Sequence, residues 1–306
     1  MEKQYVLHMF TTAKNLSPFD VNMALDAGWI SAMPYTNVTV DEIQTLVQDA
    51  IFSRSVKSVK YTGIFIGGRD TLTAMQMLHE AKKSMVPPFQ VSVFADPSGA
   101  FTTAAAMVAV AENLLARNFA GATLEGQNVL VLGGTGPVGQ IAAVLAAQAG
   151  ANVWLVGRQL EKACQVADMC NREFGAGKTH IKGEADANKA ELIKTADIVF
   201  ATAAAGVQVL DETLMATAAR LKVAADVNAV PPSGIADVAP HDNGTPIPGS
   251  ISGALGIGAL AMGGIKYQTQ SRLLNLMLER GDNKPSYLHY EHAFKIAREL
   301  MSATAA

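Results

Sequence analysis

Three glycines spaced as Gly134-x-Gly136-x-x-Gly139 stand where an apolar run gives way to an alanine-rich helical pattern. The run Val129–Leu132 predicts a buried strand, and Val138–Ala149 predicts the helix after it. In this context Gly134 permits a tight turn, Gly136 lets the backbone approach a pyrophosphate, and Gly139 lets the helix pack closely. The helix N-terminus adds unpaired N–H groups for the phosphates. We expect dinucleotide contacts from the whole loop: Gly134, Thr135, Gly136, Pro137, Val138 and Gly139. A glycine turn without a ligand is the alternative.

The end of the next strand indicates which dinucleotide binds. NAD sites usually place a carboxylate there to hold the ribose 2′-hydroxyl. Here the strand Asn152–Val156 runs into Gly157 and Arg158, and a guanidinium suits the 2′-phosphate of NADP. Lys162, one turn further, adds a second positive charge. The sequence predicts NADP, with NAD as the second choice; a solvated surface arginine is the alternative.

Two later residues are predicted to border the same cofactor. Thr202 follows the expected strand 197–201, and Asn228 follows the expected strand 223–226. Parallel strands open their carboxyl ends onto one crevice, so Asn228 could hydrogen-bond the nicotinamide carboxamide. An Asx turn before Pro231 and Pro232 is an equal alternative for Asn228.

Composition favours a globular protein of two domains. The chain has 306 residues, of which 49% are hydrophobic and 17% charged, with a net charge of -3. No basic excess suggests nucleic acid as a partner. Cys164 and Cys170 form no disulfide or zinc pattern, which favours a reducing compartment. With no signal-peptide pattern, and with 254–265 too short to span a bilayer, we expect a cytoplasmic protein without a membrane partner.

Strands and helices alternate along the chain. Strands are expected at 5–10, 63–66, 91–95, 129–132, 152–156, 197–201 and 223–226. Helices are expected at 40–52, 71–85, 102–117, 138–149, 161–174, 266–278 and 290–301. This order predicts two α/β domains around a cleft, the second with a Rossmann-type parallel sheet. The expected domains are residues 1–120 and 121–265, with the C-terminal helices of 266–306 packing back near the first.

The sequence contains no recognisable arrangement of residues for proton transfer. Dehydrogenases acting on alcohols need an acid–base group, because a hydroxyl proton leaves together with the hydride. A reaction that moves a hydride alone needs none. The six histidines form no obvious ligand set, so no metal is expected, and His289 and His292 are predicted to flank Glu291 on a surface helix.

Longer motifs carry a family resemblance. They are Ser17–Ala24, Ile51–Arg54, Gly63–Gly68, Val86–Phe89, Phe94–Thr103, Asp226–Ala236, Gly256–Ala261 and Ile265–Gln270. By these motifs nearly the whole chain resembles the methylene-tetrahydromethanopterin dehydrogenases of methylotrophic bacteria, the MtdB type more closely than the MtdA type. The loop Gly133–Gly139 looks more like the MtdA form than the MtdB form, and the pair Gly157–Arg158 favours strict NADP use, whereas the MtdB type accepts both cofactors.

The resemblance implies that a hydride passes from methylene-tetrahydromethanopterin to NADP⁺, giving the methenyl product in one-carbon oxidation. The cation that remains is an amidinium stabilised by two nitrogens, so no proton need move, which agrees with the missing acid–base group. The enzyme's main task is then to align two rings. The resemblance also suggests a homo-oligomer, for which the helix 102–117 could supply a surface.

The pterin contacts are predicted from the same resemblance. Asp20 is expected to accept N–H bonds from the aminopyrimidine edge, with a helix N-cap as the alternative. Thr102 and Thr103 are expected to open the long helix, one as N-cap and one as substrate contact. Lys266 aligns with a lysine that the family places at the reacting ring, where it would orient the pterin; the alternative is a surface lysine at a helix start.

Three other functions fit parts of the pattern. A methylene-tetrahydrofolate dehydrogenase would use the same chemistry on another carrier. An amino-acid or shikimate-type dehydrogenase would need a Lys–Asp acid–base pair. A non-catalytic NADP-binding sensor would leave Asp20 and the threonine pair without a small-molecule partner.

Overall fold

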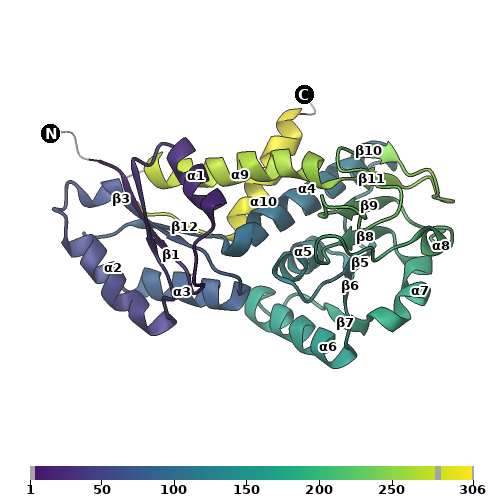
Figure 1. Ribbon diagram of the computed structural model, residues 1–306, viewed down its shortest axis with the longest axis horizontal. Coiled ribbons are helices and arrows are strands. Elements are labelled where there is room, and N and C mark those ends of the chain that lie inside the picture. The colour runs from purple at the N-terminus through teal and green to yellow at the C-terminus, as the bar shows by residue number, and fades with distance from the viewer. Residues whose placement is uncertain (1–3, 280–283, 305–306) are drawn as a thin grey trace. The chain divides into compact units, whose positions relative to one another are not determined.

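The computed structural model describes residues 4–279 and 284–304 (Figure 1). The chain divides into two compact units, residues 1–102 with 267–296 and residues 103–266 with 297–306. This division falls earlier than the expected boundary at 120/121, because the helix α4 (Ala100–Asn118) continues through the division. Its later part belongs to the second unit, where Glu112 pairs with Arg298 at 2.6 Å.

The first unit is built on a parallel sheet in the order β12-β4-β3-β1-β2. Its strands are β1 (Val6–Phe10), β2 (Ser31–Tyr35), β3 (Thr62–Ile66), β4 (Ser92–Ala95) and β12 (Tyr287–Leu288). Its helices include α1 (Pro18–Asp26), α2 (Ile43–Phe52) and α3 (Thr71–Lys83). Every residue of β3 and β4 is buried, as expected for inner strands of a parallel sheet.

The second unit has a sheet in the order β10-β11-β9-β8-β5-β6-β7, in which only β10 runs antiparallel to its neighbour. Its strands are β5 (Asn128–Leu132), β6 (Asn152–Gly157), β7 (Lys182–Ala185), β8 (Ile198–Ala201), β9 (Val223–Asp226), β10 (Asn243–Pro246) and β11 (Leu255–Ile257). Numbered from β5, the parallel strands follow the 3-2-1-4-5-6 order of dinucleotide-binding sheets. The predicted class, two α/β domains with a Rossmann-type sheet in the second, is confirmed.

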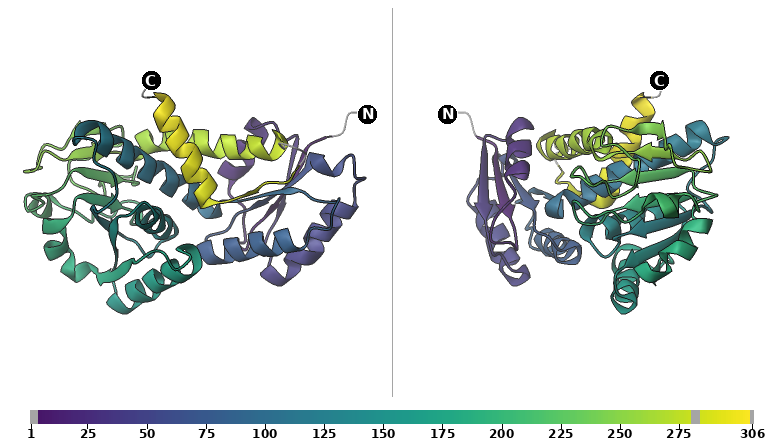
Figure 2. Two further views of the ribbon diagram at one scale, coloured as in Figure 1. Left: turned by 180° about the vertical axis from the view of Figure 1, so that it is seen from behind. Right: turned by 45° about the vertical axis from the view of Figure 1, so that its right-hand side comes forward.

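The helices of the second unit lie in the connections between these strands (Figure 2). They are α5 (Pro137–Gln148), α6 (Leu160–Met169), α7 (Lys189–Leu192) and α8 (Glu212–Met215). The expected helix 161–174 is observed over its length, with α-helical hydrogen bonding to Met169 and π-helical hydrogen bonding in its last turn, Cys170–Phe174. The last two helices of the chain are α9 (Ala259–Glu279) and α10 (Tyr290–Thr304).

Burial explains the apolar character of α4. The segment Pro97–Asn118 is long and apolar enough to cross a bilayer by length and composition alone. Its most apolar window of 18 residues has a mean hydropathy of 1.4, and 72% of that window is buried inside the protein. The residues Ala104–Ala111 are almost completely inaccessible. They are therefore not available as a surface for another subunit, and the prediction of an oligomer surface on this helix is wrong over that stretch.

The two histidines near the start of α10, His289 and His292, are half-buried, and Glu291 between them is exposed. Burial, followed by the nearby His292, His79 and Lys82, lowers the pKa of His289 to about 3. Burial also lowers the pKa of His292. The prediction of a surface helix agrees with α10, which exposes Glu291 and Lys295, although both histidine rings are partly covered. The residues before α10 pair with β4 as strand β12 and belong to the first unit.

Candidate functional site

The carboxyl ends of β5 and β8 form the point where the strand order of the second sheet reverses. The carbonyl of Leu132, the last residue of β5, accepts hydrogen bonds from the backbone N–H of Thr202 at 2.8 Å and from its hydroxyl at 2.9 Å. Open α/β sheets bind ligands at such a reversal point. The predicted position of Thr202 beside this crevice agrees with the fold.

Two glycines let the loop after β5 pass close to β8 and β6. Gly133 has a φ of +72°, and a Cβ on it would lie 2.6 Å from the backbone nitrogen of Ala203. Gly133 is therefore the turn residue, a role that the sequence had given to Gly134. At Gly134 an added Cβ would lie 2.7 Å from Cγ of Leu155, so this glycine serves close packing.

The other two glycines of the motif, Gly139 and Gly136, differ in whether the protein itself leaves room for a side chain. A Cβ on Gly139 would lie 2.6 Å both from Cα of Gly134 and from Oγ1 of Thr202, so internal packing excludes a side chain there. Gly136 has an ordinary φ of -79°, and the nearest protein atom to an added Cβ is the Gly133 oxygen at 3.5 Å. Neither strain nor packing within the protein requires glycine at Gly136.

A cavity of about 450 Å³ lies beside this loop. Its lining comes from the ends of several strands and includes Gly133, Thr135, Gly136, Gly157, Arg158, Asp186, Lys189 and Thr202. Gly136 faces this cavity, and a missing side chain there leaves room for a close backbone contact with a ligand. The donors present fit a dinucleotide: α5 starts at this loop with Pro137 as its first residue and Val138 next, so its N-terminal N–H groups are available for phosphates.

A smaller pocket of about 290 Å³ continues from the same loop and is lined by Thr135, Arg158, Gln159 and Lys162. Arg158 and Lys162 are exposed, and over residues 4–279 and 284–304 neither takes part in an ion pair. The structure thus brings together the two cations that the sequence assigned to a 2′-phosphate. Such a pair can bind an anion without first breaking an internal contact.

Sequence analysis missed Asp186 and Lys189 in the larger cavity. They form an ion pair at 3.2 Å just after β7, the strand that pairs with β6. This strand reads Lys-Gly-Glu-Ala and lacks the β-branched residues typical of strands, so nothing in the sequence placed its carboxyl end at the crevice.

Asn228 is part of a tightly hydrogen-bonded loop. Its Oδ1 accepts the N–H of Val230 at 2.9 Å, which is an Asx turn, and its Nδ2 donates to the carbonyl of Pro232 at 2.8 Å. Its own N–H donates to Asp226, whose carboxylate also accepts the N–H of Gly234 at 2.6 Å. Burial raises the pKa of Asp226, against the effect of these N–H bonds. The hydrogen bonds support the Asx-turn interpretation of Asn228, and the contact with the carboxamide stays a prediction.

In the first unit, Asp20 lies within α1 and is buried. Its Oδ1 accepts a hydrogen bond from Nε2 of Gln270, on α9, at 2.9 Å. The N-cap residue of α1 is Ser17, so the alternative role of Asp20 as an N-cap is wrong. Gln270 was not singled out from the sequence, because a contact between residues so far apart in the chain leaves no local pattern.

Thr102 is not an N-cap either, since α4 begins at Ala100. The carboxylate of Asp96 accepts the N–H groups of Phe101 at 2.9 Å and Thr102 at 3.2 Å, which is the capping role. The buried hydroxyl of Thr102 donates to Oδ2 of Asp96 at 2.6 Å. Thr103 is half-buried and lies in the first turns of the helix, where its substrate contact stays a prediction.

Lys266 is half-buried and lies inside α9 rather than at a helix start. The predicted start of this helix was too late because Gly263 and Gly264 weaken the helical pattern before it. Lys266 precedes Gln270 by four residues, so the two side chains leave the same face of α9. Asp20, another predicted pterin contact, is hydrogen-bonded to that Gln270.

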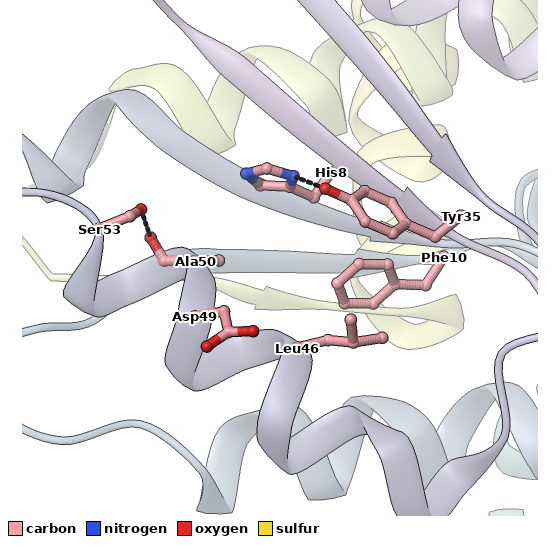
Figure 3. A pocket seen from close by; sticks show the side chains of 7 residues that line it. All are labelled: His8, Phe10, Tyr35, Leu46, Asp49, Ala50 and Ser53. Carbon is pink, nitrogen blue, oxygen red and sulfur yellow. Dashed lines mark hydrogen bonds between the residues drawn. The ribbon is translucent and has the colours of Figure 1, made fainter.

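The first unit also has a cavity of about 170 Å³ between the sheet edge and α2 (Figure 3). Nδ1 of His8 lies 3.0 Å from the hydroxyl of Tyr35, and the cavity is also lined by Asp49 of α2 and by Ser53, which directly follows that helix. Burial, and secondarily the charge of Arg54, lowers the pKa of His8, so its ring is neutral near neutral pH. No predicted site residue lies in this cavity.

Comparisons with known proteins were made for the whole chain. Residues 18–98 match the family model described as methylene-tetrahydromethanopterin dehydrogenase, N-terminal. The chain is 42% identical over 296 residues to the NAD(P)-dependent methylenetetrahydromethanopterin dehydrogenase of Methylorubrum extorquens AM1, covering 96% of this chain and 98% of that protein. It is 34% identical to the Bifunctional protein MdtA of the same organism, over 96% and 98% of the two chains.

Among solved structures, the ligand-free 5-ketofructose reductase of Gluconobacter sp. strain CHM43 shares the fold. The TM-score is 0.51 at 15% identity, covering 97% of this chain and 99% of that chain. At this identity the likeness concerns the fold alone.

The two glycines with different surroundings give a matched test of the cavity. We expect Gly139→Ala to lower the free energy of unfolding by about 1–3 kcal/mol, since its Cβ overlaps Gly134 and Thr202. We expect Gly136→Ala to lower the stability less than Gly139→Ala, since it changes only the N-cap residue of α5, but to weaken dinucleotide binding by roughly tenfold to a hundredfold, because it displaces the phosphates. Calorimetry and fluorescence titration measure the two effects. Unchanged dinucleotide affinity in Gly136→Ala would show that this loop does not hold the phosphates.

Proposed function

The chain belongs to the methylene-tetrahydromethanopterin dehydrogenase family, and from this we propose that it transfers a hydride from methylene-tetrahydromethanopterin to a nicotinamide dinucleotide. The observation that carries the proposal is the identity of 42% with a relative of that name, extending over nearly the full length of both chains. The recognition made from sequence motifs, with one type closer than the other, is confirmed by the two levels of identity.

The proposed chemistry sets modest demands on the protein. Nicotinamide, when bound, supplies the hydride acceptor. The carbon that loses the hydride lies between two nitrogens, whose lone pairs stabilise the cation, so no side chain has to remove a proton. Binding and orientation are the main catalytic tasks, and they are worth several powers of ten in rate when the reacting atoms are held in line.

The residues of the first unit and of α9 fit the pterin side. The buried carboxylate of Asp20 is suited to accept two N–H bonds from an aminopyrimidine edge. The ammonium of Lys266 can donate to the pterin and orient its ring; a cation beside the product would also oppose the build-up of positive charge there. Both remain proposed roles.

We propose NADP as the preferred dinucleotide. Support comes from Arg158 and Lys162, which line one pocket beside the glycine loop, and from the absence of a carboxylate at the end of β6. The closer relative is named as using NAD or NADP, so the family fixes the cofactor class and leaves the choice to these residues.

We also propose that the protein works in the reducing cytoplasm. Cys164 and Cys170 are both free, and burial raises the pKa of Cys170 to about 12, which keeps it an unreactive thiol.

The activity is tested by mixing purified protein with methylene-tetrahydromethanopterin and either NADP⁺ or NAD⁺. We expect growth of the reduced-nicotinamide absorbance band with both cofactors and a lower KM for NADP⁺. A parallel assay with methylene-tetrahydrofolate serves as the control for the carrier. A clear preference for the folate carrier, or cofactor binding without turnover of any carrier, would contradict the proposal.

The cofactor preference is tested by Arg158→Ala. Loss of a charge-assisted bond to the 2′-phosphate should raise the KM for NADP⁺ by roughly tenfold to a hundredfold and leave that for NAD⁺ unchanged. Arg172→Ala, which removes an exposed arginine paired with Glu173, is the matched control and should change neither. An equal rise for both cofactors would mean that Arg158 does not recognise the 2′-phosphate.

The role of Lys266 is tested by Lys266→Ala. We expect kcat/KM for the pterin to fall roughly tenfold to a hundredfold, the loss of one charged hydrogen bond, without a new pH dependence of kcat. Lys57→Ala, at an exposed lysine, is the control. Full kcat/KM in Lys266→Ala would exclude a substantial role, and a new pH dependence would indicate that the lysine moves a proton.

A further inference from the structure

Gln270 holds a buried hydrogen-bond acceptor that the protein does not use. The residue is 0% exposed, and its Nε2 donates to Asp20 at 2.9 Å. Its Oε1 is buried and has no hydrogen-bond partner among the residues that the structure describes. An unpaired buried acceptor is unfavourable, because the group has lost its water and gained nothing in return.

The orientation of the amide follows from its partner. An ionised carboxylate only accepts hydrogen bonds, so the amide nitrogen must face Asp20 and the amide oxygen must point elsewhere. Turning the amide over would place two oxygens against each other. The unpaired Oε1 is therefore fixed by the Asp20 contact.

One residue proposed for the pterin, Asp20, is in contact with this amide, and Lys266 leaves the same face of α9 one turn earlier. A reduced pterin carries several ring and exocyclic N–H groups close together. A carboxylate can accept two of them, and a neighbouring carbonyl oxygen is suited to accept another.

We propose that Gln270 is a substrate-binding residue: its Oε1 accepts an N–H of the reduced pterin while its Nε2 holds the carboxylate of Asp20 in place. The inference rests on the proposed function and adds a contact to it. A glutamine serves both purposes because it presents a donor to Asp20 and an acceptor to the ligand. A glutamate would repel Asp20, and an apolar residue would serve neither group. The matched family model ends at residue 98, so this residue lies outside it.

The test is Gln270→Met, which keeps the approximate length and volume of the side chain and removes both polar groups. Binding is followed by tryptophan fluorescence with tetrahydromethanopterin that lacks the methylene group and therefore has no hydride to transfer. We expect its dissociation constant to rise at least about tenfold, since a site built around a hydrogen bond loses affinity when the partner is removed. The dissociation constant for NADP⁺, bound by the second unit, should not change. Gln268→Met, at an exposed glutamine of the same helix, is the control and should behave as the unmodified protein.

A double-mutant cycle with Asp20→Ala separates the two parts of the role. If Oε1 contacts the pterin directly, Gln270→Met still weakens binding several-fold in the Asp20→Ala background. If its effect disappears there, Gln270 acts only through Asp20 and the direct contact is wrong. If Gln270→Met also loses NADP⁺ binding, the same pterin titration is made with Gln270→Asn, which keeps the amide on a shorter side chain. That titration then decides whether Oε1 contacts the pterin.

Two results would overturn the proposal in distinguishable ways. Equal pterin affinity in Gln270→Met and the unmodified protein would show that the residue is not part of the site. Failure of the unmodified protein to bind tetrahydromethanopterin at all would reject the proposed function, and with it this role.

Discussion

The close approach of the β5 loop to the end of β8 is the constraint on which the cofactor half depends. The carbonyl of Leu132 accepts both the N–H and the hydroxyl of Thr202, which ties the two strand ends together. Such proximity leaves no room for side chains at Gly133, Gly134 or Gly139, each of which would bring a Cβ within 3 Å of neighbouring atoms. Gly136 is the exception, and its free space faces the cavity. Three glycines thus serve the fold, and one is left for a ligand.

Features that depend on neighbouring residues could be predicted from the sequence, and features that depend on contacts between distant residues could not. The strands β5, β6, β8 and β9 were predicted because each is a short apolar run bounded by polar or glycine residues, and burial on both faces of a parallel sheet demands that composition. β2 contains Pro34 and β7 contains Gly183, and both lie at sheet edges where composition is less constrained. The loop and its two cations could be predicted because they are contiguous. The pair Asp20–Gln270 could not, since 250 residues separate its members.

Helix starts were the commonest error, and the reason is physical. A hydroxyl or carboxyl before an apolar run is the usual N-cap signal. At α4 that signal was assigned to the threonines, whereas Asp96, further back, accepts the N–H groups of Phe101 and Thr102. The sequence contains both patterns, and only the three-dimensional contact distinguishes the carboxylate that caps the helix from the hydroxyl that donates to it.

Buried polar groups in this protein divide according to whether the chain itself satisfies them. Asp226 accepts three backbone N–H bonds around the loop of Asn228, so its contacts are complete and structural. Asp96 is similarly engaged with the start of α4. At Gln270 the contacts are incomplete, because one polar atom is paired with Asp20 and the other has no partner within residues 4–279 and 284–304. A reaction that moves no proton needs no acid or base at its centre, but it does need acceptors and donors held ready for the substrate. A fixed, unsatisfied acceptor is such a group, which is why the incomplete site rather than the completed ones marks where a pterin would be recognised.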